Sequence, residues 1–363
     1  MKKYSWYIFP FVVALGASIL HAQTQNAPEV PIAGTQLLHI NSTIVNQLYD
    51  IYVSLPRNYD DTTQAFPVIY VNDAQWDFTL VTALYGQQYF DGFIPGCIVV
   101  GVTWGGPHPN PDSLRVRDYT PTHTDQAPQS GGAEQYIKFL KTELIPFIDQ
   151  KYRTKKDDRT MVGSSLGGLI TLYTLFTAND TFNRFILTSP AIDWANKSID
   201  RYQKDFVAHH PERVLRVYLA EGGLEPGAKA FTDYVEQLKK AEVPLVRIDS
   251  KVIDNVGHSG GKADGYTRGL QFVFARPSIS VPATVLDTYT GTYKYGISVD
   301  RDETGLFINL PNGLRMKLLA ETDKDFYIKG QYSFWHFIHD QKGGISGIRI
   351  EQFTGTQFLP KSQ

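Results

Sequence analysis

The chain has 363 residues, of which 42% are hydrophobic and 20% charged, which argues against whole-chain disorder and provides for a large core. Its formal net charge of −2 argues against a nucleic-acid partner, because such a partner is bound by a basic surface. The single cysteine, Cys97, rules out an intramolecular disulfide and lies in an apolar run, where its expected role is packing.

Residues 1–22 have the three-part pattern of a secretory signal peptide. Met1-Lys2-Lys3 precedes an apolar stretch, and the segment ends at Ala22, after which we expect cleavage. An uncleaved membrane anchor is the alternative, but Pro10 interrupts the run, and roughly 15 apolar residues fall short of the about 20 that span a bilayer. The sequence therefore predicts a periplasmic or secreted protein with no stable membrane anchor after cleavage.

Strand-like and helix-like segments alternate from residue 35 to residue 276, after a polar linker at 23–34. Residues 36–43 and 47–55 alternate between apolar and polar side chains, which is typical of an antiparallel hairpin at a sheet edge. Apolar runs predict buried strands at Pro67–Val71, Cys97–Thr103, Phe185–Thr188 and Val214–Leu219, and a last strand is expected at Leu245–Val252. Helices are expected at Gln135–Lys151, Ala228–Lys240 and Gly260–Phe274, and a long loop at 104–132. This alternation predicts an α/β fold with a mostly parallel sheet flanked by helices.

The last part of the chain has a different pattern. After a linker at residues 277–284, short alternating runs are separated by turn sequences such as Pro311-Asn312-Gly313, and no helical period is found. Residues 285–363 are therefore predicted to form a small all-β domain.

Residues 159–175 combine an apolar strand, the sequence Gly163-Ser164-Ser165-Leu166-Gly167 and an apolar helix. A serine at such a strand–turn–helix junction sits in a strained backbone with its hydroxyl exposed at the edge of the sheet. A glycine-rich connection without chemistry is the alternative, and the flanking strand, helix and Gly168 argue against it. Ser165 is the predicted nucleophile.

An oxyanion hole needs backbone amides beside the nucleophile. The amide of Leu166 is expected to supply the first donor. The loop after Pro67–Val71 is expected to supply the second donor, from Ala74 or Gln75.

A serine hydroxyl needs a base, and the base needs an acid to orient it. His258 follows the last predicted strand of the α/β region and precedes its last helix, which makes it the predicted base. Glu225, in the loop after Val214–Leu219, is the predicted acid. Glu221 and Asp193 remain alternatives, as does a site with no working acid.

Aromatic and basic side chains near these loops are candidates for substrate binding. Trp76 and Trp104 are expected either to wall the pocket or to pack in the core. Arg117 is a candidate to bind a carboxylate or phosphate, or else anchors its loop through Asp118. The sequence contains no zinc-type histidine motif and no phosphate-binding glycine loop, so no metal and no cofactor is predicted.

These motifs together resemble the Putative esterase family of α/β-hydrolases, which contains esterase D, feruloyl esterases and ferric-siderophore esterases. The resemblance covers about residues 35–275 and rests on residues 71–76, Arg117-Asp118-Tyr119-Thr120-Pro121, residues 143–148 and residues 162–168. It implies a serine esterase with a triad of Ser165, His258 and, less securely, Glu225. Ala74 departs from the family by standing where a glycine is usual. Residues 289–293 give the β-domain a weaker similarity to lipocalin-like domains of secreted hydrolases.

The resemblance and the predicted site imply ester hydrolysis through an acyl-serine intermediate. The expected substrate is a small molecule or glycan ester, either an acylated carbohydrate or a siderophore lactone. An acyltransferase with the same triad and a binding protein on a hydrolase scaffold are the alternatives.

Overall fold

The computed structural model describes residues 32–60, 63–352 and 355–362. The predicted signal peptide and most of the linker that follows it lie outside these residues. In the described part of the chain, no helix is long and apolar enough to cross a membrane.

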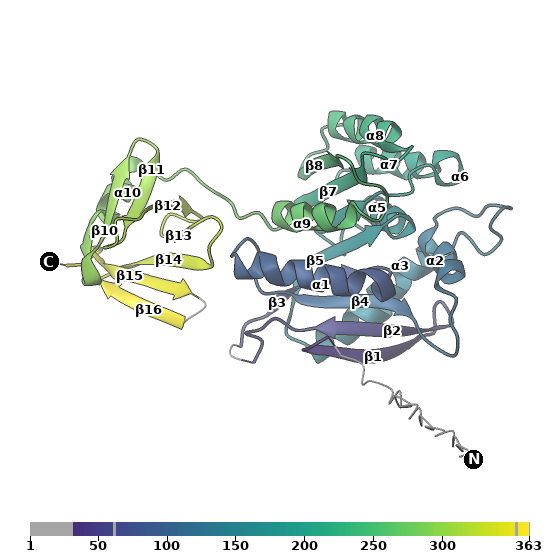
Figure 1. The fold of residues 1–363 in the computed structure, drawn as a ribbon, viewed down its shortest axis with the longest axis horizontal. Coiled ribbons are helices and arrows are strands. Elements are labelled where there is room, and N and C mark those ends of the chain that lie inside the picture. Colours follow the sequence, from purple (N-terminus) through teal and green to yellow (C-terminus); the bar gives the residue numbers. More distant parts are fainter. Residues whose placement is uncertain (1–31, 61–62, 353–354, 363) are drawn as a thin grey trace, which may run out of the picture. The chain divides into compact units, whose positions relative to one another are not determined.

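The first sheet contains eight strands in the order β1-β2-β4-β3-β5-β6-β7-β8 (Figure 1). Its strands are β1 (Thr35–Ser42), β2 (Gln47–Ser54), β3 (Phe66–Val71), β4 (Ile98–Trp104), β5 (Thr154–Ser164), β6 (Arg184–Thr188), β7 (Leu215–Gly222) and β8 (Val246–Ile253). β1 and β2 form an antiparallel hairpin at one edge, β2 pairs antiparallel with β4, and the remaining neighbours are parallel. The predicted mostly parallel sheet is confirmed.

Helices cover both faces of this sheet. They are α1 (Ala74–Phe90), α2 (Pro111–Tyr119), α3 (Ala133–Phe139), α4 (Ile145–Lys151), α5 (Leu166–Thr177), α6 (Trp194–Lys197), α7 (Ile199–Ala208), α8 (Ala228–Lys240) and α9 (Lys262–Val273). Side chains of α1 and α9 pack with one set of strand residues, while α3, α4, α5, α7 and α8 pack with the other set. Successive strand residues point to opposite faces, so the continuous apolar runs are buried on both sides.

The segment predicted as one helix at residues 135–151 is a helix with an irregular centre. A π-helical turn, η1 (Leu140–Leu144), joins α3 to α4. Pro146 lies at the start of α4 and has no backbone N–H, so it cannot continue the regular hydrogen-bond ladder. The expected long loop at residues 104–132 is interrupted by α2, which Asn110 caps by accepting a hydrogen bond from the Ser113 amide at 3.1 Å.

The second sheet belongs to the C-terminal β-domain and is antiparallel throughout, as predicted for an all-β domain. Its strands are β9 (Gly291–Tyr293), β10 (Ile297–Asp302), β11 (Gly305–Asn309), β12 (Arg315–Ala320), β13 (Asp325–Tyr327), β14 (Ser333–His339), β15 (Ile345–Gln352) and β16 (Gly355–Pro360). The helix α10 (Ala283–Tyr289) precedes them, and a short 3₁₀ turn, η2 (Lys294–Gly296), follows β9. A bridge between Tyr293 and Lys361 nearly closes the sheet into a barrel.

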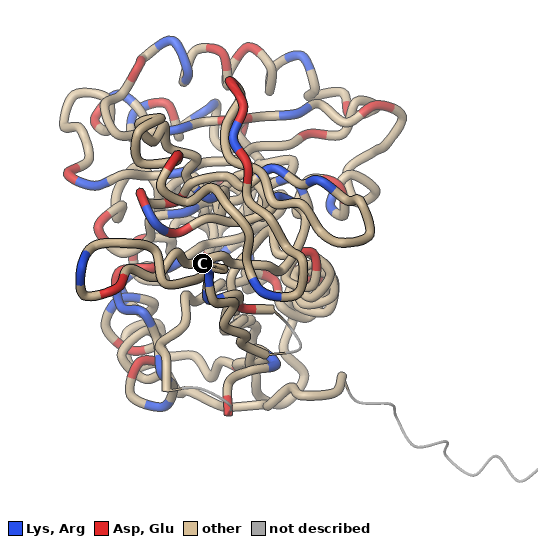
Figure 2. The backbone as a smooth tube through the Cα atoms, turned by 90° about the vertical axis from the view of Figure 1, so that its left-hand side faces the viewer, with Lys and Arg blue, Asp and Glu red and all other residues tan. Residues whose placement is uncertain are grey.

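The two sheets have separate apolar cores. Among the described residues, the buried clusters on the two faces of the first sheet share no residue with the buried cluster of the β-domain. Basic and acidic residues are interspersed along the backbone in the view of Figure 2. The architecture is thus a mostly parallel sheet with helices on both faces, followed by a small antiparallel β-domain.

Candidate active site

Ser165 occupies the turn between β5 and α5. Its backbone has φ 60° and ψ −120°, a conformation that a non-glycine residue adopts only at a cost in energy. Two hydrogen bonds hold the turn, from the Ser165 amide to the Thr188 carbonyl at 3.0 Å and from the Ala191 amide to the Ser165 carbonyl at 3.1 Å. A Cβ at position 163 would lie 2.1 Å from the Gly167 carbonyl oxygen, so only glycine fits there. These residues form the strained elbow expected from the sequence.

His258 and Glu225 form a close pair at the same edge of the sheet. The Nδ1 atom of His258 lies 2.6 Å from Oε2 of Glu225. The other carboxylate oxygen of Glu225 accepts the Ser189 hydroxyl at 2.6 Å and the Gly222 amide at 2.9 Å. Burial raises the pKa of Glu225, but the hydrogen bonds from Ser189 and His258 outweigh it and hold that pKa below its ordinary value. Glu225 is therefore an ionised acceptor for the imidazole.

Backbone contacts explain how Glu225 reaches the histidine. The loop after β7 is hydrogen-bonded to the loop after β8, from the Gly223 amide to Ile253 at 2.7 Å and from the Leu224 amide to Val256 at 3.0 Å. A Cβ at Gly222 would lie 2.8 Å from the Val256 and Gly257 carbonyl oxygens. The glycine thus permits the close approach of the loop that carries His258.

The other acid candidates lie differently. Glu221 is the penultimate residue of β7 and is only 7% exposed. Burial, with the nearby charges of Glu225 and Asp193, raises the pKa of Glu221 to about 8. Asp193 is exposed and lies just before α6. In the described part of the chain, only Glu225 of these three carboxylates is hydrogen-bonded to His258.

The side chain of His258 is 48% exposed, which leaves its ring accessible to a substrate. Within the residues that the structure describes, no hydrogen bond joins the Ser165 hydroxyl to the imidazole. Catalytic hydrogen bonds are often long without substrate and shorten when it binds. The hydrogen bond to Glu225 orients the imidazole ring of His258.

Two helix N-termini supply the amides predicted for an oxyanion hole. Leu166 is the first residue of α5, and Ala74 and Gln75 begin α1. The first amides of a helix have no acceptor within the helix and carry the positive end of its dipole. The three predicted donors therefore lie at helix ends where a developing negative charge would be stabilised.

Asp73 holds the start of α1 beside the elbow, and the sequence analysis did not single it out. This residue has φ 53° and is buried. Its carboxylate accepts two hydrogen bonds from Arg115, at 3.1 and 2.8 Å, and a Cβ at Gly167 would lie 2.9 Å from it. Burial raises the pKa of Asp73, and the Arg115 guanidinium opposes that rise. The ion pair positions the strained residue that precedes the amides predicted for the oxyanion hole.

A second buried network joins α1 to α9, and it too was missed. Asp77 accepts hydrogen bonds from Lys262 at 2.8 Å and from the Tyr266 hydroxyl at 2.6 Å. Lys262 is the first residue of α9 and comes four residues after His258. The network therefore fixes the histidine loop relative to the helix that carries Ala74 and Gln75. Its partners are far apart in the chain, and only the position of Lys262 next to the histidine loop could have suggested it.

The three predicted substrate-binding side chains have different surroundings. Trp76 is 48% exposed, and the Arg115 guanidinium lies 5.4 Å from its ring centroid, so it faces solvent near the elbow. Trp104 is 3% exposed and its indole donates to Asp118 at 2.7 Å, which places it in the core rather than on a pocket wall. Arg117 donates to the same carboxylate at 2.7 and 3.1 Å, which is the loop-anchoring alternative.

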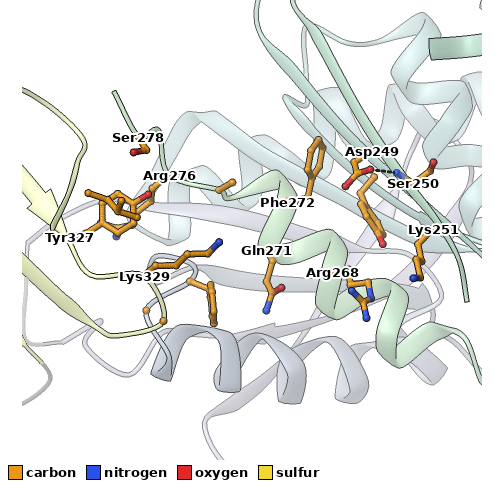
Figure 3. Close-up of a pocket in the computed structure, with 16 residues that line it drawn as sticks. Asp249, Ser250, Lys251, Arg268, Gln271, Phe272, Arg276, Ser278, Tyr327 and Lys329 are labelled. Atoms are coloured by element: carbon orange, nitrogen blue, oxygen red, sulfur yellow. Dashed lines mark hydrogen bonds between the residues drawn. The ribbon is translucent and has the colours of Figure 1, made fainter. Parts of the chain in front are cut away.

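A cavity of about 620 Å³ lies elsewhere in the compact unit of residues 34–363 (Figure 3). Its lining includes Asp249, Lys251 and Arg268 from β8 and α9, and Tyr327 and Lys329 from the β-domain. None of the described residues that line it belongs to the set of Ser165, His258 and Glu225. Among the described residues, no group of three or more metal-ligating side chains was found either.

Comparisons with known proteins identify the family of this chain. The family model described as Putative esterase matches residues 42–252. The ferri-bacillibactin esterase BesA of Bacillus subtilis is 32% identical over 223 residues, which are 57% of this chain and 75% of that protein. A siderophore triacetylfusarinine C esterase of Aspergillus fumigatus is 26% identical over 184 residues, 49% of this chain and 63% of that protein.

A solved structure supports the fold independently of the sequence family. The crystal structure of the BES protein from Bacillus cereus superposes with a TM-score of 0.63 at 24% identity, and it covers 68% of this chain and 97% of that one. The matched family segment runs from the end of β1 into β8 and so contains the elbow and Glu225. The chain belongs to the Putative esterase family and is an esterase with an α/β-hydrolase fold.

Proposed function

We propose that this esterase hydrolyses a siderophore-type ester or lactone through an acyl intermediate on Ser165. The observation that carries the proposal is the strained Ser165 at the sheet edge that also holds the His258–Glu225 pair, whose nitrogen and oxygen are 2.6 Å apart. The names of the relatives from Bacillus subtilis and Aspergillus fumigatus support the siderophore class. An acylated carbohydrate, the other substrate class that the sequence resemblance implies, is the second candidate.

The proposed reaction has two balanced halves. His258 takes the hydroxyl proton of Ser165 as the serine oxygen bonds to the ester carbon, and the amides of Leu166 and of Ala74 or Gln75 receive the negative carbonyl oxygen. Collapse of this intermediate breaks the bond to the alcohol, which leaves with the proton from His258. Water then attacks the acyl-serine with His258 as base, and the acid is released as Ser165 recovers its proton.

A pair of adjacent serines gives a matched test of the nucleophile. Ser165→Ala should lower hydrolysis of p-nitrophenyl acetate by about 10⁴-fold or more and abolish labelling by a fluorophosphonate probe. Ser164→Ala should keep both activities, because its hydroxyl is buried and makes no hydrogen bond within the described residues. Full activity of Ser165→Ala would overturn the proposal.

The substrate class needs a separate screen. Purified protein would be offered a siderophore trilactone with and without ferric iron, a feruloyl ester and an acetylated sugar, with product analysis. The proposal expects the highest kcat/KM on the trilactone. A higher kcat/KM on the acetylated sugar would instead select the carbohydrate ester.

We also propose that the enzyme acts outside the cytoplasm, on the basis of the leader pattern in residues 1–22. Expression of the full chain in a bacterial host, followed by N-terminal sequencing of the periplasmic fraction, tests this. A mature protein that begins at Gln23 is expected, and a cytoplasmic protein that retains Met1 would contradict it.

A further inference from the structure

Lys262 connects the loop of the candidate base to helix α1. It is the first residue of α9 and follows His258 by four positions. Its amide donates to the Ser259 carbonyl at 3.4 Å, which ties it to the turn that carries the histidine. Its side chain crosses to α1 and donates to the Asp77 carboxylate at 2.8 Å. One residue thus joins the histidine loop to the helix whose first amides are predicted for the oxyanion hole.

Helix α9 also packs against the support of the nucleophile turn. A Cβ at Gly265, in the first turn of α9, would lie 2.6 Å from Cγ2 of Thr188, so the helix lies close against the end of β6. The Thr188 carbonyl in turn accepts the Ser165 amide at 3.0 Å. The start of α9 is therefore part of the reaction edge, which is the edge of the sheet that carries Ser165, His258 and Glu225.

Asp77 places a negative charge where the reaction requires the opposite potential. It is the fourth residue of α1, about 4.5 Å of helical rise from Ala74, and its side chain is only 3% exposed. The amides at this end of the helix are expected to receive the oxygen that becomes negative during ester hydrolysis. A carboxylate without a cation on the same turn would repel that oxygen, and its burial would limit screening by water and salt.

A cation offsets each of the two carboxylates at this end of α1. Arg115 lies 2.8 Å from Asp73, and Lys262 lies 2.8 Å from Asp77. Burial raises the pKa of Asp73, and hydrogen bonds from Arg115 oppose that rise. Beyond these effects, the charge of Asp77 raises the same pKa and the charge of Lys262 lowers it. Both charges therefore act on the residue directly before the amides predicted for the oxyanion hole.

We propose that Lys262 is a positioning residue of the esterase, which acts through Asp77 by cancelling its charge at the oxyanion end of α1. The proposal rests on the proposed function, since the oxyanion arises only from ester cleavage at Ser165. It deepens that function by assigning a role in the reaction to a side chain outside the set of nucleophile, base, acid and oxyanion amides.

A double variant separates the charge of Lys262 from its contact with α1. Lys262→Met leaves the Asp77 charge without its cation, so we expect kcat on p-nitrophenyl acetate to fall about 10²-fold, with KM within about threefold of the wild-type value. Asp77→Asn/Lys262→Met has neither the charges nor the ion pair, and its kcat should recover to within about fivefold of the wild type. A purely structural contact would leave the double variant as impaired as the single one.

Inhibition by phenylboronic acid reports on the charge of the oxyanion. This compound forms a negatively charged tetrahedral adduct with a serine nucleophile, so its Ki should rise about as much as kcat falls in Lys262→Met and should recover in the double variant. Arg268→Met is the matched control, because it breaks an exposed ion pair with Asp264 at 2.7 Å on the same helix. The control should keep the wild-type kcat and Ki.

The outcomes separate the role of Lys262 from the reaction itself. If Lys262→Met does not fold, Lys262→Gln takes its place, because a glutamine amide can still donate to Asp77 but carries no charge. Wild-type kcat in the single variant, or an equal loss in the single and double variants, would overturn the role of Lys262. Hydrolysis of p-nitrophenyl acetate by the wild type and fluorophosphonate labelling of Ser165 would still support the proposed function in that case. Failure of the wild type in both assays would overturn the proposed function, and the role of Lys262 with it.

Discussion

The two sheets of this protein use their side chains in different ways. In the first sheet, polar residues with strained backbones lie at the carboxyl ends of the parallel strands, namely the half-buried Ser165 and the buried Asp73. In the β-domain, the interior is filled by its own aromatic and aliphatic residues, and the Tyr289 and Phe337 rings stack with centroids 4.1 Å apart. The candidate catalytic serine thus lies at a strained backbone position of the first sheet, whereas the buried side chains of the antiparallel domain pack against one another.

Among substitutions outside the proposed nucleophile, the largest effect should follow from filling the space that Gly163 leaves behind the Ser165 turn. Gly163→Ala would place a methyl group 2.1 Å from a backbone oxygen, which cannot move as a side chain does. We expect at least a 10³-fold loss of kcat/KM on p-nitrophenyl acetate and a strongly lowered melting temperature. Gly86→Ala, in α1, is the matched control, because nothing lies within 4 Å of its added Cβ. A native-like Gly163→Ala enzyme would show that the elbow is not strained as described.

The next prediction distinguishes Glu225 from Glu221, of which Glu221 lies near the end of β7 and Glu225 in the loop that follows. Glu225→Gln should lower kcat by about 10³-fold, because an amide no longer stabilises the imidazolium and can select the wrong tautomer of His258. Glu221→Gln should lower kcat less than tenfold, since Glu221 makes no hydrogen bond to the imidazole in the part of the chain described. Steady-state kinetics on p-nitrophenyl acetate measures both. If Glu225→Gln retained full kcat, the site would be a serine–histidine dyad.

A change inside the β-domain should have a large effect on stability and none on the reaction. Phe337 is almost completely buried and contacts Tyr289, Tyr293 and Phe326. Phe337→Ala should cost about 3 to 5 kcal/mol of the free energy of unfolding of this domain. Calorimetry should show an earlier transition, while kcat on p-nitrophenyl acetate remains that of the wild type. A parallel loss of kcat would mean that the barrel supports the active site.

The strands of the first sheet were easier to predict from the sequence than the polar contacts at the ends of those strands. Most strands of the parallel sheet were predictable within about one residue, because a sheet covered on both faces requires continuous apolar runs. Two were not: β7 extends beyond the predicted end at Leu219 to Gly222, and β5 begins at Thr154 instead of Arg159. The elbow and the place of His258 followed from a short motif and from chain order. Helix α1 was not predicted, since β-branched and glycine residues weaken its intrinsic preference and packing on the sheet decides its structure.

The polar networks of the site were beyond sequence reasoning for a different reason. Asp73 and Arg115 are 42 positions apart, and Asp77 and Lys262 are 185 positions apart. No spacing rule relates residues on separate elements, so these pairs emerge only when the fold is known. Helix α2 was also not predicted, although Asn110 followed by Pro111 is a recognisable helix start.

The smallest effect is a pH dependence of stability, which should differ in direction between Glu221 in the first sheet and Asp325 in the β-domain. Burial raises the pKa of Glu221 to about 8, whereas at Asp325 of the β-domain hydrogen bonds from His336 and Thr322 outweigh burial and lower the pKa. Between its ordinary pKa of 4.5 and about 8, Glu221 is protonated in the folded protein and ionised when unfolded, so stability falls as pH rises through this window. Glu221→Gln should therefore match the wild type near pH 4.5 and exceed its stability near pH 8.5 by about 2 to 4 kcal/mol.

Asp325→Asn should show the opposite dependence on pH. This variant should be less stable than the wild type above the ordinary pKa of Asp325, and the difference should disappear as pH falls below that value, because the stabilisation from a lowered pKa is then lost. Urea unfolding of Glu221→Gln between pH 4.5 and 8.5, and of Asp325→Asn above and below the ordinary pKa of 3.8, measures the two trends. A Glu221→Gln advantage that did not grow with pH would show that the carboxyl group is solvated and that the reaction edge is as open as the surface of the β-domain.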